Sequence, residues 1–368
     1  MDRTAGTELQ GTSYYGPNCK DQTAGTNYMD RVMRVKNFSL QQTLECGQCF
    51  NFEKIDENEY VVMAYGRVLH VIQHGASEAG NPKAGSGEVF ANTESELEFV
   101  NAAPEDIQNI WVPYFDLDRD YDEIKAAVIA AEPRLESVIK KYGGIRILNQ
   151  EFPETLLSFI ISQNKNIPQI KKIVRSICDG FSKSQETVRI KTESGYEDRL
   201  YHPFPDVDTL KNMTEDDFRT LKTGFRAPYL INAIRAMYGE SGGAMPEGSA
   251  VPKAGELPEV GVMPESGTLP EQPELLQGEK LKAMSFEEAK TALTGIKGVG
   301  DKVANCVLLF SLGFRSAFPV DVWIKRVMEE MYFGCDTPKK EIEHFALEKF
   351  GKWGGYAQQY LFMYIREK

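Results

Sequence analysis

The chain has 368 residues, which is enough for one to three domains with a large buried core, and its formal net charge is −12. No run of eighteen apolar residues occurs, so the sequence excludes a hydrophobic helix that crosses a membrane. The first residues lack a basic segment followed by an apolar core, so we expect no secretory signal. We therefore expect a protein that acts inside the cell, in the cytoplasm or nucleoid of a prokaryote or in the nucleus of a eukaryote.

The cysteines argue against a structural metal site. Six are scattered through the chain, at Cys19, Cys46, Cys49, Cys178, Cys306 and Cys335. Cys46 and Cys49 form a CxxC pair without a second pair or a nearby histidine, which argues against zinc. So few cysteines in so long a chain also argue against a framework of disulfides.

The first third of the chain is predicted to be a β domain. Residues 1–29 are rich in Gly, Thr, Asn and Tyr and predict a disordered tail, whereas residues 30–118 contain short runs typical of antiparallel strands. These runs are Val32–Val35, Cys49–Phe52, Tyr60–Tyr65 and Val68–Ile72. Gly66 marks a tight turn between the last two runs. Residues 75–95 are rich in Gly, Ala, Ser and Glu and predict a long loop.

Residues 119–368 are predicted to be mainly helical, which makes the fold class α+β. Pro153–Ser162 is a strongly apolar segment and predicts a buried helix. Polar residues and Pro168 are expected to end it, and Ile170–Phe181 predicts the next helix. Ser285 and Glu288 have the spacing of a capping box at the start of a later helix.

An acidic segment interrupts the helical region. Residues 239–278 are rich in Pro, Gly and Glu, a composition that buries too little apolar surface to fold alone, so we predict a disordered insertion. Glu240–Lys280 contains eight Glu and two Lys, a net charge of −6 and therefore half of the total. Four basic residues share one helical stretch elsewhere, and such a local patch can attract a polyanion: Lys165, Lys171, Lys172 and Arg175.

Residues 286–313 predict two helices joined by a tight hairpin. Gly298 and Gly300 flank one apolar residue, so the backbone can turn sharply and approach a ligand closely. Asp301 is expected to cap the second helix, and Gly313 is expected to lie just after its end. Free N–H groups at such a helix start attract an anion, most simply a DNA phosphate.

Lys302 and Asp321 are the candidate catalytic residues. Lys302 lies in the first turn of the second helix, where the helix dipole disfavours an ammonium and favours the neutral, nucleophilic amine. Asp321 is expected to begin a further helix, and an acid beside an amine can serve as its electrostatic partner. From spacing alone, a solvated lysine and a simple helix cap remain the alternative interpretation.

The segment Gly298–Cys306, followed by Pro319-Val320-Asp321, resembles the signature of the helix-hairpin-helix DNA glycosylases, and in particular their 8-oxoguanine branch. The resemblance extends from Tyr28 to Lys368, apart from the predicted loop and the acidic insertion. It implies that Lys302 attacks C1′ of the damaged nucleotide while Asp321 supports the cationic transition state. It also implies no cofactor, and the four-cysteine cluster of endonuclease III-like relatives is missing, which indicates a metal-free enzyme.

The resemblance also assigns a pocket for the damaged base. Gln358 and Phe362 are four residues apart and share a helix face, where the amide would pair with the Watson–Crick edge and the ring would stack on the base. Cys306 would form the opposite wall. The Gly47 carbonyl would accept a hydrogen bond from N7–H, which 8-oxoguanine has and guanine lacks. Guanine would place its N7 lone pair against this carbonyl, and two facing acceptors cost about 1–3 kcal/mol, which corresponds to a preference for 8-oxoguanine of roughly 10–100-fold. Without the resemblance, Phe362 would be ordinary core and Gln358 ordinary surface.

Residues for the opposite base depart in part from the family pattern. By resemblance, Asn164 lies near the void left by the flipped base and Arg226 bonds the orphaned cytosine. Phe225 replaces the usual wedge tyrosine, and Gln169 stands where eukaryotic members tend to have a second arginine. Since a lost charged contact relaxes selectivity, we predict a weaker preference for cytosine.

These observations predict a bifunctional DNA glycosylase and AP lyase that removes 8-oxoguanine from double-stranded DNA. We expect a monomer. Two alternatives remain: a glycosylase for another damaged purine, and a non-catalytic DNA-binding protein with a helix-hairpin-helix.

Overall fold

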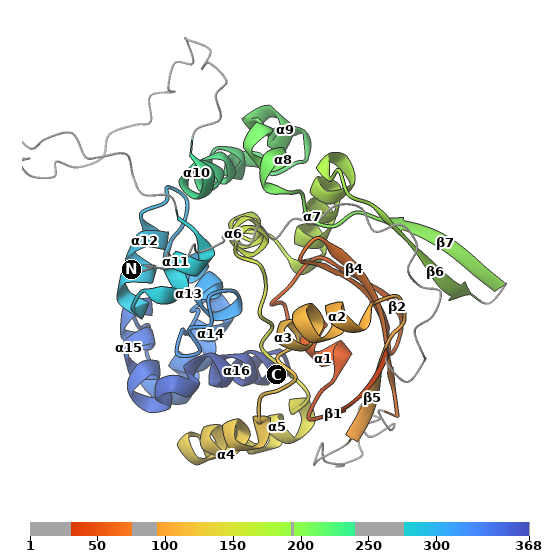
Figure 1. The fold of residues 1–368 in the computed structure, drawn as a ribbon. Coiled ribbons are helices and arrows are strands. Elements are labelled where there is room, and N and C mark those ends of the chain that lie inside the picture. Colours follow the sequence, from red (N-terminus) through yellow and green to blue (C-terminus); the bar gives the residue numbers. More distant parts are fainter. Residues whose placement is uncertain (1–30, 76–93, 193–194, 240–275, 368) are drawn as a thin grey trace, which may run out of the picture.

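The computed structural model describes residues 31–75, 94–192, 195–239 and 276–367. The predicted tail, most of the predicted loop and most of the acidic insertion lie outside these residues. The described part contains an antiparallel sheet followed by a helical region (Figure 1), so the predicted fold class is confirmed. None of its helices is long and apolar enough to cross a membrane.

The main sheet has five strands in the order β1-β5-β4-β3-β2, and every neighbouring pair is antiparallel. The strands are β1 (Val32–Lys36), β2 (Phe52–Asp56), β3 (Glu59–Ala64), β4 (Arg67–His74) and β5 (Glu94–Phe99). Strand β3 is buried on both faces. Tyr60, Val62 and Ala64 pack into the core beneath the neighbouring helices, whereas Val61 and Met63 pack under a separate hairpin. Turn residues Tyr65 and Gly66 both have positive φ (53° and 67°), as a tight hairpin requires.

One predicted strand was misplaced, and three strands of the described residues were not predicted. Strand β2 begins at Phe52, so the predicted strand Cys49–Phe52 is mostly loop. Strand β5 was not predicted, because only Leu97 and Phe99 are apolar in a segment otherwise made of Glu and Ser. The hairpin of β6 (Glu186–Thr192) and β7 (Gly195–Tyr201) was also missed, since its outer face is polar.

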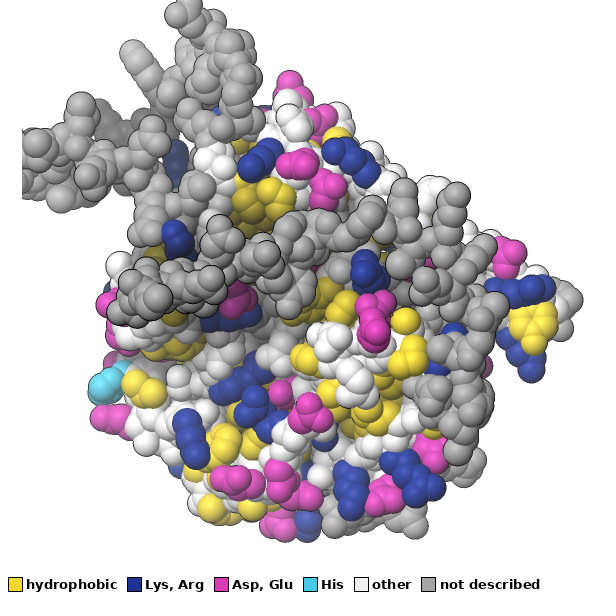
Figure 2. Space-filling view, in the orientation of Figure 1, with side chains coloured by type: hydrophobic (Ala, Val, Ile, Leu, Met, Phe, Trp, Pro, Cys, Tyr) yellow, Lys and Arg dark blue, Asp and Glu magenta, His cyan; other side chains and the backbone are white. Residues whose placement is uncertain are grey.

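The β6–β7 hairpin extends away from the rest of the molecule (Figure 1). At its far end an exposed hydrophobic side chain lies among basic ones (Figure 2). Tyr196 is 66% exposed there, and the Arg189 guanidinium lies 5.1 Å from its ring centre. Elsewhere this face mixes acidic and basic side chains rather than gathering one sign of charge (Figure 2).

The helical region is built around α6, whose side chains are almost all buried. Helices α7, α10 and α13 pack against it. The α-helices are α1 (Leu40–Glu45), α2 (Pro104–Asp106), α3 (Val112–Tyr114), α4 (Tyr121–Ala131), α5 (Glu136–Tyr142), α6 (Phe152–Ile161), α7 (Ile167–Phe181), α8 (Val207–Asn212), α9 (Glu215–Thr220), α10 (Ala227–Tyr238), α11 (Gly278–Ala283), α12 (Phe286–Thr294), α13 (Asp301–Phe310), α14 (Val322–Met328), α15 (Lys339–Phe350) and α16 (Gly354–Glu367). Short π or 3-10 segments are η3 (Ile107–Trp111), η4 (Pro133–Leu135), η5 (Gly224–Arg226), η6 (Glu329–Phe333) and η7 (Gly351–Trp353).

Helix ends show which sequence signals were interpreted correctly. The capping box of Ser285 and Glu288 is present at the start of α12, as predicted. Helix α7 begins earlier than predicted, because Pro168 lies in its first turn, where a missing N–H is tolerated, rather than breaking it. The cap of α13 is Gly300, and Asp301 is the first helical residue, so the predicted Asp301 cap was wrong.

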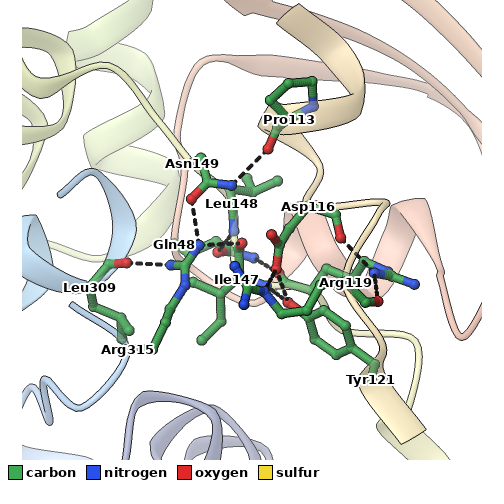
Figure 3. A network of polar contacts seen from close by, with 11 residues as sticks. Gln48, Pro113, Asp116, Arg119, Tyr121, Ile147, Leu148, Asn149, Leu309 and Arg315 are labelled. Carbon is green, nitrogen blue, oxygen red and sulfur yellow. Dashed lines mark hydrogen bonds and ion pairs between the residues drawn. The ribbon is translucent and has the colours of Figure 1, made fainter. Parts of the chain in front are cut away.

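A polar junction joins the β domain to the helices (Figure 3). The fully buried Gln48 donates from Nε2 to the carbonyls of Thr43 (2.8 Å) and Arg146 (2.7 Å), and its Oε1 accepts from the Leu148 N–H (2.9 Å). On the other side of the same segment, Arg315 donates to the Leu309 carbonyl (2.6 Å) and to the Asn149 side chain. The loop that contains Gly47 is therefore held firmly against the helical region.

Candidate active site

The hairpin between α12 and α13 places a helix start at the surface. Gly298 has a φ of +102°, and a Cβ there would lie 2.3 Å from Cγ of Tyr229, so only glycine fits. Gly300 has an extended conformation (φ −98°, ψ 178°) and caps α13 without a side chain. The first N–H groups of α13 consequently have no side-chain cap and can donate to an anion.

The Lys302 amine is held by two contacts from α6. Nζ of Lys302 lies 3.2 Å from Oγ of Ser162 and 4.9 Å from the ring centre of Phe159. Phe159 is buried, and the Lys302 side chain is half-buried. The amine is thus fixed in a partly enclosed position rather than extended into solvent, which argues against the alternative of a solvated surface lysine.

Asp321 is the N-cap of α14, and it shares an environment with Lys302. Its Oδ1 accepts hydrogen bonds from the backbone N–H groups of Trp323 (3.0 Å) and Ile324 (2.8 Å). Burial raises the pKa of the Cys306 thiol to about 11; Lys302 acts to lower it and Asp321 to raise it. Because both charges act on this one thiol, Lys302 and Asp321 both lie near Cys306.

Gln358 and Phe362 extend this site along α16. The buried Gln358 donates from Nε2 to the carbonyl of Pro319 (3.4 Å), two residues before Asp321, and its Oε1 accepts from Gln359 (2.8 Å). Phe362, one turn later, is half-buried, and the Arg366 guanidinium lies 5.6 Å from its ring centre. Gln358 therefore connects α16 to the Pro319 segment that precedes Asp321.

Gly47, the predicted acceptor for the damaged base, lies in the β domain beside the start of α7. Its φ is +88°, and a Cβ would lie 3.3 Å from Cδ1 of Ile167 at the start of α7. Burial raises the pKa of the neighbouring Cys46 thiol to about 12, and the positive charge of Arg366 acts in the opposite direction. The same Arg366 guanidinium lies over the Phe362 ring.

The three predicted opposite-base residues lie in the turn after α6, which contains Asn164, and in η5, which contains Phe225 and Arg226. Asn164 is exposed and has a φ of +52°. Phe225 is 53% exposed, whereas the adjacent Arg226 is only 4% exposed. The Arg226 guanidinium donates to the carbonyls of Thr223 (3.1 Å) and Gln163, so it is turned into the protein rather than towards solvent.

Gln163 connects these loops to the hairpin. Its carbonyl accepts from Arg226, and its side-chain Nε2 donates to the carbonyl of Gly298 (2.9 Å). The Tyr229 ring packs on Gly298 from the same side and meets Phe225 edge-on, with ring centres 6.2 Å apart. The nucleophile side and the opposite-base side of the site are thus joined through one residue of α6's C-terminal turn.

Comparison with known proteins identifies the family. Residues 32–156 match the 8-oxoguanine DNA glycosylase N-terminal domain, and residues 157–352 match the HhH-GPD superfamily of base excision DNA repair proteins. The chain is 34% identical to the Clostridium acetobutylicum 8-oxoguanine glycosylase/lyase solved with dsDNA containing cytosine opposite 8-oxoG. That similarity covers 90% of this chain and 93% of that chain, with a TM-score of 0.67. The chain belongs to the 8-oxoguanine DNA glycosylase family.

Two curated relatives of this glycosylase family are more distant. N-glycosylase/DNA lyase OGG1 of Arabidopsis thaliana is 28% identical over 239 residues, which cover 63% of this chain and 55% of that protein. N-glycosylase/DNA lyase of Saccharomyces cerevisiae is 29% identical over 235 residues, which cover 58% of this chain and 54% of that protein. The chain therefore spans about half the length of these relatives. A 3-methyladenine DNA glycosylase of Archaeoglobus fulgidus, 19% identical over 85% of this chain and 89% of that one, shares the fold (TM-score 0.55).

Four residues of this glycosylase-family site were not predicted from the sequence: Phe159, Ser162, Gln163 and Tyr229. Ser162 and Gln163 stand where the apolar helix gives way to polar residues, and that boundary was the available signal. Tyr229 had no local signal, because its role comes from packing on Gly298, far away in the chain.

Proposed function

We propose that this protein is a bifunctional DNA glycosylase and AP lyase that excises 8-oxoguanine from double-stranded DNA in base excision repair. One observation supports this most: the Lys302 amine is held within 3.2 Å of Ser162 and shares its environment with Cys306 and Asp321. A helix start without a side-chain cap, suited to a DNA phosphate, lies at the same point of the chain.

In the glycosylase step, the neutral Lys302 amine forms a bond to C1′ of a nucleotide turned out of the duplex. The bond from C1′ to the base nitrogen breaks, its electron pair leaves with the base, and the base takes up the proton that the amine loses. Positive charge develops on the sugar meanwhile, and the Asp321 carboxylate, held by two N–H groups, stabilises it.

In the lyase step, the sugar ring opens to give a Schiff base between Lys302 and C1′. Loss of a proton from C2′ then expels the 3′ phosphate with the electron pair of the C3′–O bond, so the strand is cut 3′ to the lesion. The scheme requires no metal or organic cofactor, because the amine supplies both the nucleophile and the electron sink.

Discrimination between 8-oxoguanine and guanine falls to the Gly47 carbonyl. The Gln48 network fixes the peptide that follows Gly47, so this acceptor cannot easily turn away from a guanine lone pair. The cost of two facing acceptors is about 1–3 kcal/mol. Gln358 and Phe362 complete the pocket by pairing with and stacking on the base.

Opposite-base reading falls to Asn164, Phe225 and Arg226, with cytosine accepted but only modestly preferred. The protein acts as a monomer on double-stranded DNA, inside the cell where that substrate is.

Borohydride trapping tests the proposal. A duplex with 8-oxoguanine opposite cytosine should give a covalent complex with the wild-type protein, and Lys302→Gln should abolish it. Lys297→Gln, an exposed lysine of the same hairpin, is the matched control and should still be trapped. Trapping only on another damaged purine would favour a glycosylase of different specificity, and DNA binding without trapping would indicate a non-catalytic protein.

A further inference from the structure

We propose that Ser162 is a positioning residue for the nucleophile: its hydroxyl orients the Lys302 amine and sets the pH range in which the amine reacts. This inference rests on the proposed role of Lys302. Ser162 is the C-cap of α6, a helix whose side chains are almost all buried, so the position of its backbone is set by the core.

The direction of the hydrogen bond follows from the partners of Ser162. Its hydroxyl donates its single hydrogen to the carbonyl of Phe159 (2.7 Å), and its backbone N–H donates to the carbonyl of Ser158 (2.9 Å). The oxygen can therefore only accept from Lys302. The amine donates one N–H towards Ser162, at 3.2 Å.

This contact orients the lone pair of the neutral amine. An amine that donates one N–H to Ser162 keeps its lone pair free but directed away from that oxygen. The Phe159 ring occupies a second side of the amine, and it is itself fixed by stacking on Phe310 (5.6 Å, 15°) and by an edge contact with Phe50 (5.5 Å, 73°). The two contacts of the amine, with Ser162 and with Phe159, both come from α6 and its C-cap. The lone pair of the amine therefore points away from α6.

The same contacts influence proton binding. A hydroxyl acceptor and an aromatic face both stabilise an ammonium more than an amine, whereas the start of α13 disfavours the ammonium. Among the described residues, the charged or titratable groups near Lys302 include Cys306 on its own helix, Asp321 at the start of α14, and the adjacent Asp301, which pairs with Lys290 of α12 (3.6 Å). Removal of the Ser162 acceptor should therefore let the amine react at lower pH but with poorer orientation.

Single-turnover borohydride trapping, measured across pH on 8-oxoguanine DNA, separates the two effects. Ser162→Ala should trap about 3–10-fold more slowly at its pH plateau, which corresponds to one lost hydrogen bond. The pH of half-maximal rate should move down by about half a unit. Ser162→Thr, which keeps the hydroxyl, should restore both values. Ser176→Ala is the matched control, because Ser176 also bonds to a carbonyl of its own helix (Lys172, 2.9 Å) but lies on α7.

Several outcomes would overturn the inference. A Ser162→Ala variant with the wild-type rate and pH profile would contradict the inference. A variant that is slower but shows no pH shift, and whose rate is not restored in Ser162→Thr, would show that Ser162 has only a structural role. If Ser162→Ala proves to melt early, Ser162→Cys, a weaker acceptor of similar size, should shift the profile in the same direction. Failure of the wild-type protein to be trapped at all would remove the proposed function, and this inference with it, whereas normal wild-type trapping isolates the role of Ser162.

Discussion

The two sides of the site differ in how far they are prepared for their tasks. On the nucleophile side, Lys302 already contacts Ser162 and Phe159, and Asp321 accepts two backbone N–H groups. On the opposite-base side, Phe225 is exposed and Arg226 donates to backbone carbonyls inside the protein. On the roles proposed for these residues, the nucleophile side is preorganised, whereas Arg226 would have to leave its present partners before it could read a base.

Gln169 adds to this contrast. Its side-chain Oε1 accepts from the N–H of Asn166, and its own N–H donates to the Asn166 side chain, which together form a capping box at the start of α7. The residue that occupies the place of a second base-reading arginine is therefore used for helix capping. This agrees with the expectation of weak opposite-base selectivity, which stays a prediction.

The largest effect is expected from Lys302→Gln, because it removes the nucleophile itself. Excision and strand cleavage should fall at least about a thousandfold, while affinity for DNA with a stable abasic analogue changes little. Single-turnover cleavage and a binding titration measure the two quantities. Residual nicking within tenfold of wild type would mean that another group carries the chemistry.

A smaller loss is expected from Asp321→Asn. Asparagine still caps α14, so the fold is kept, but the negative charge that stabilises the cationic sugar is gone. We expect a roughly hundredfold slower glycosylase step at an unchanged melting temperature. Asp206→Asn is the control, since Asp206 caps α8 through the N–H of Thr209 (2.7 Å). Equal glycosylase rates in Asp321→Asn and Asp206→Asn would mean that Asp321 serves only as a helix cap.

Gly298→Ala should damage the connection between the two sides. A Cβ at this position would lie 2.3 Å from Tyr229, at a φ of +102°, and the Gly298 carbonyl accepts from Gln163. We expect a loss of about 1–3 kcal/mol in the free energy of unfolding and weaker DNA binding. Gly300→Ala has open space around its Cβ and should be nearly neutral in the same thermal melts. A reversed order would contradict the account of the hairpin.

The smallest change is expected in opposite-base preference. The wild-type protein should cleave 8-oxoguanine opposite cytosine only modestly faster than opposite the other three bases. Gln169→Arg should increase that preference about tenfold by adding a charged contact, at a small cost in stability from the lost capping box. Rates on four duplexes that differ only opposite the lesion measure both. A steep cytosine preference in the wild type would show that Gln169 is not the limiting residue.

Local signals predicted much of the fold. Short apolar runs identified β3 and β4, and the apolar run of α6 and the Ser285 capping box located their helices. Strand β5 was missed because its exposed face is polar, and only pairing with the distant β1 and β4 makes it a strand. The β6–β7 hairpin was missed because most of its outward-facing side chains are polar. The Asp301 cap failed because the backbone of Gly300 takes that position.

The site was predicted as residues rather than as a network. The roles of Lys302 and Asp321 were inferred from helix starts and a resemblance, and the charges of both act on the pKa of the Cys306 thiol. The contacts of Ser162 with Lys302 and of Gln163 with Gly298 join segments well over a hundred residues apart in sequence. No periodicity or motif records such pairings, because they arise from how α6 packs against α13.

Identification of the residue bound to DNA tests the central claim most directly. The complex trapped by borohydride on 8-oxoguanine DNA would be digested with a protease and its cross-linked peptide sequenced by mass spectrometry. We predict that the sugar fragment is attached to Nζ of Lys302. Attachment to Lys165, the basic residue beside Asn164, or to Lys297 in the hairpin would contradict the assignment of the nucleophile and the mechanism built on it.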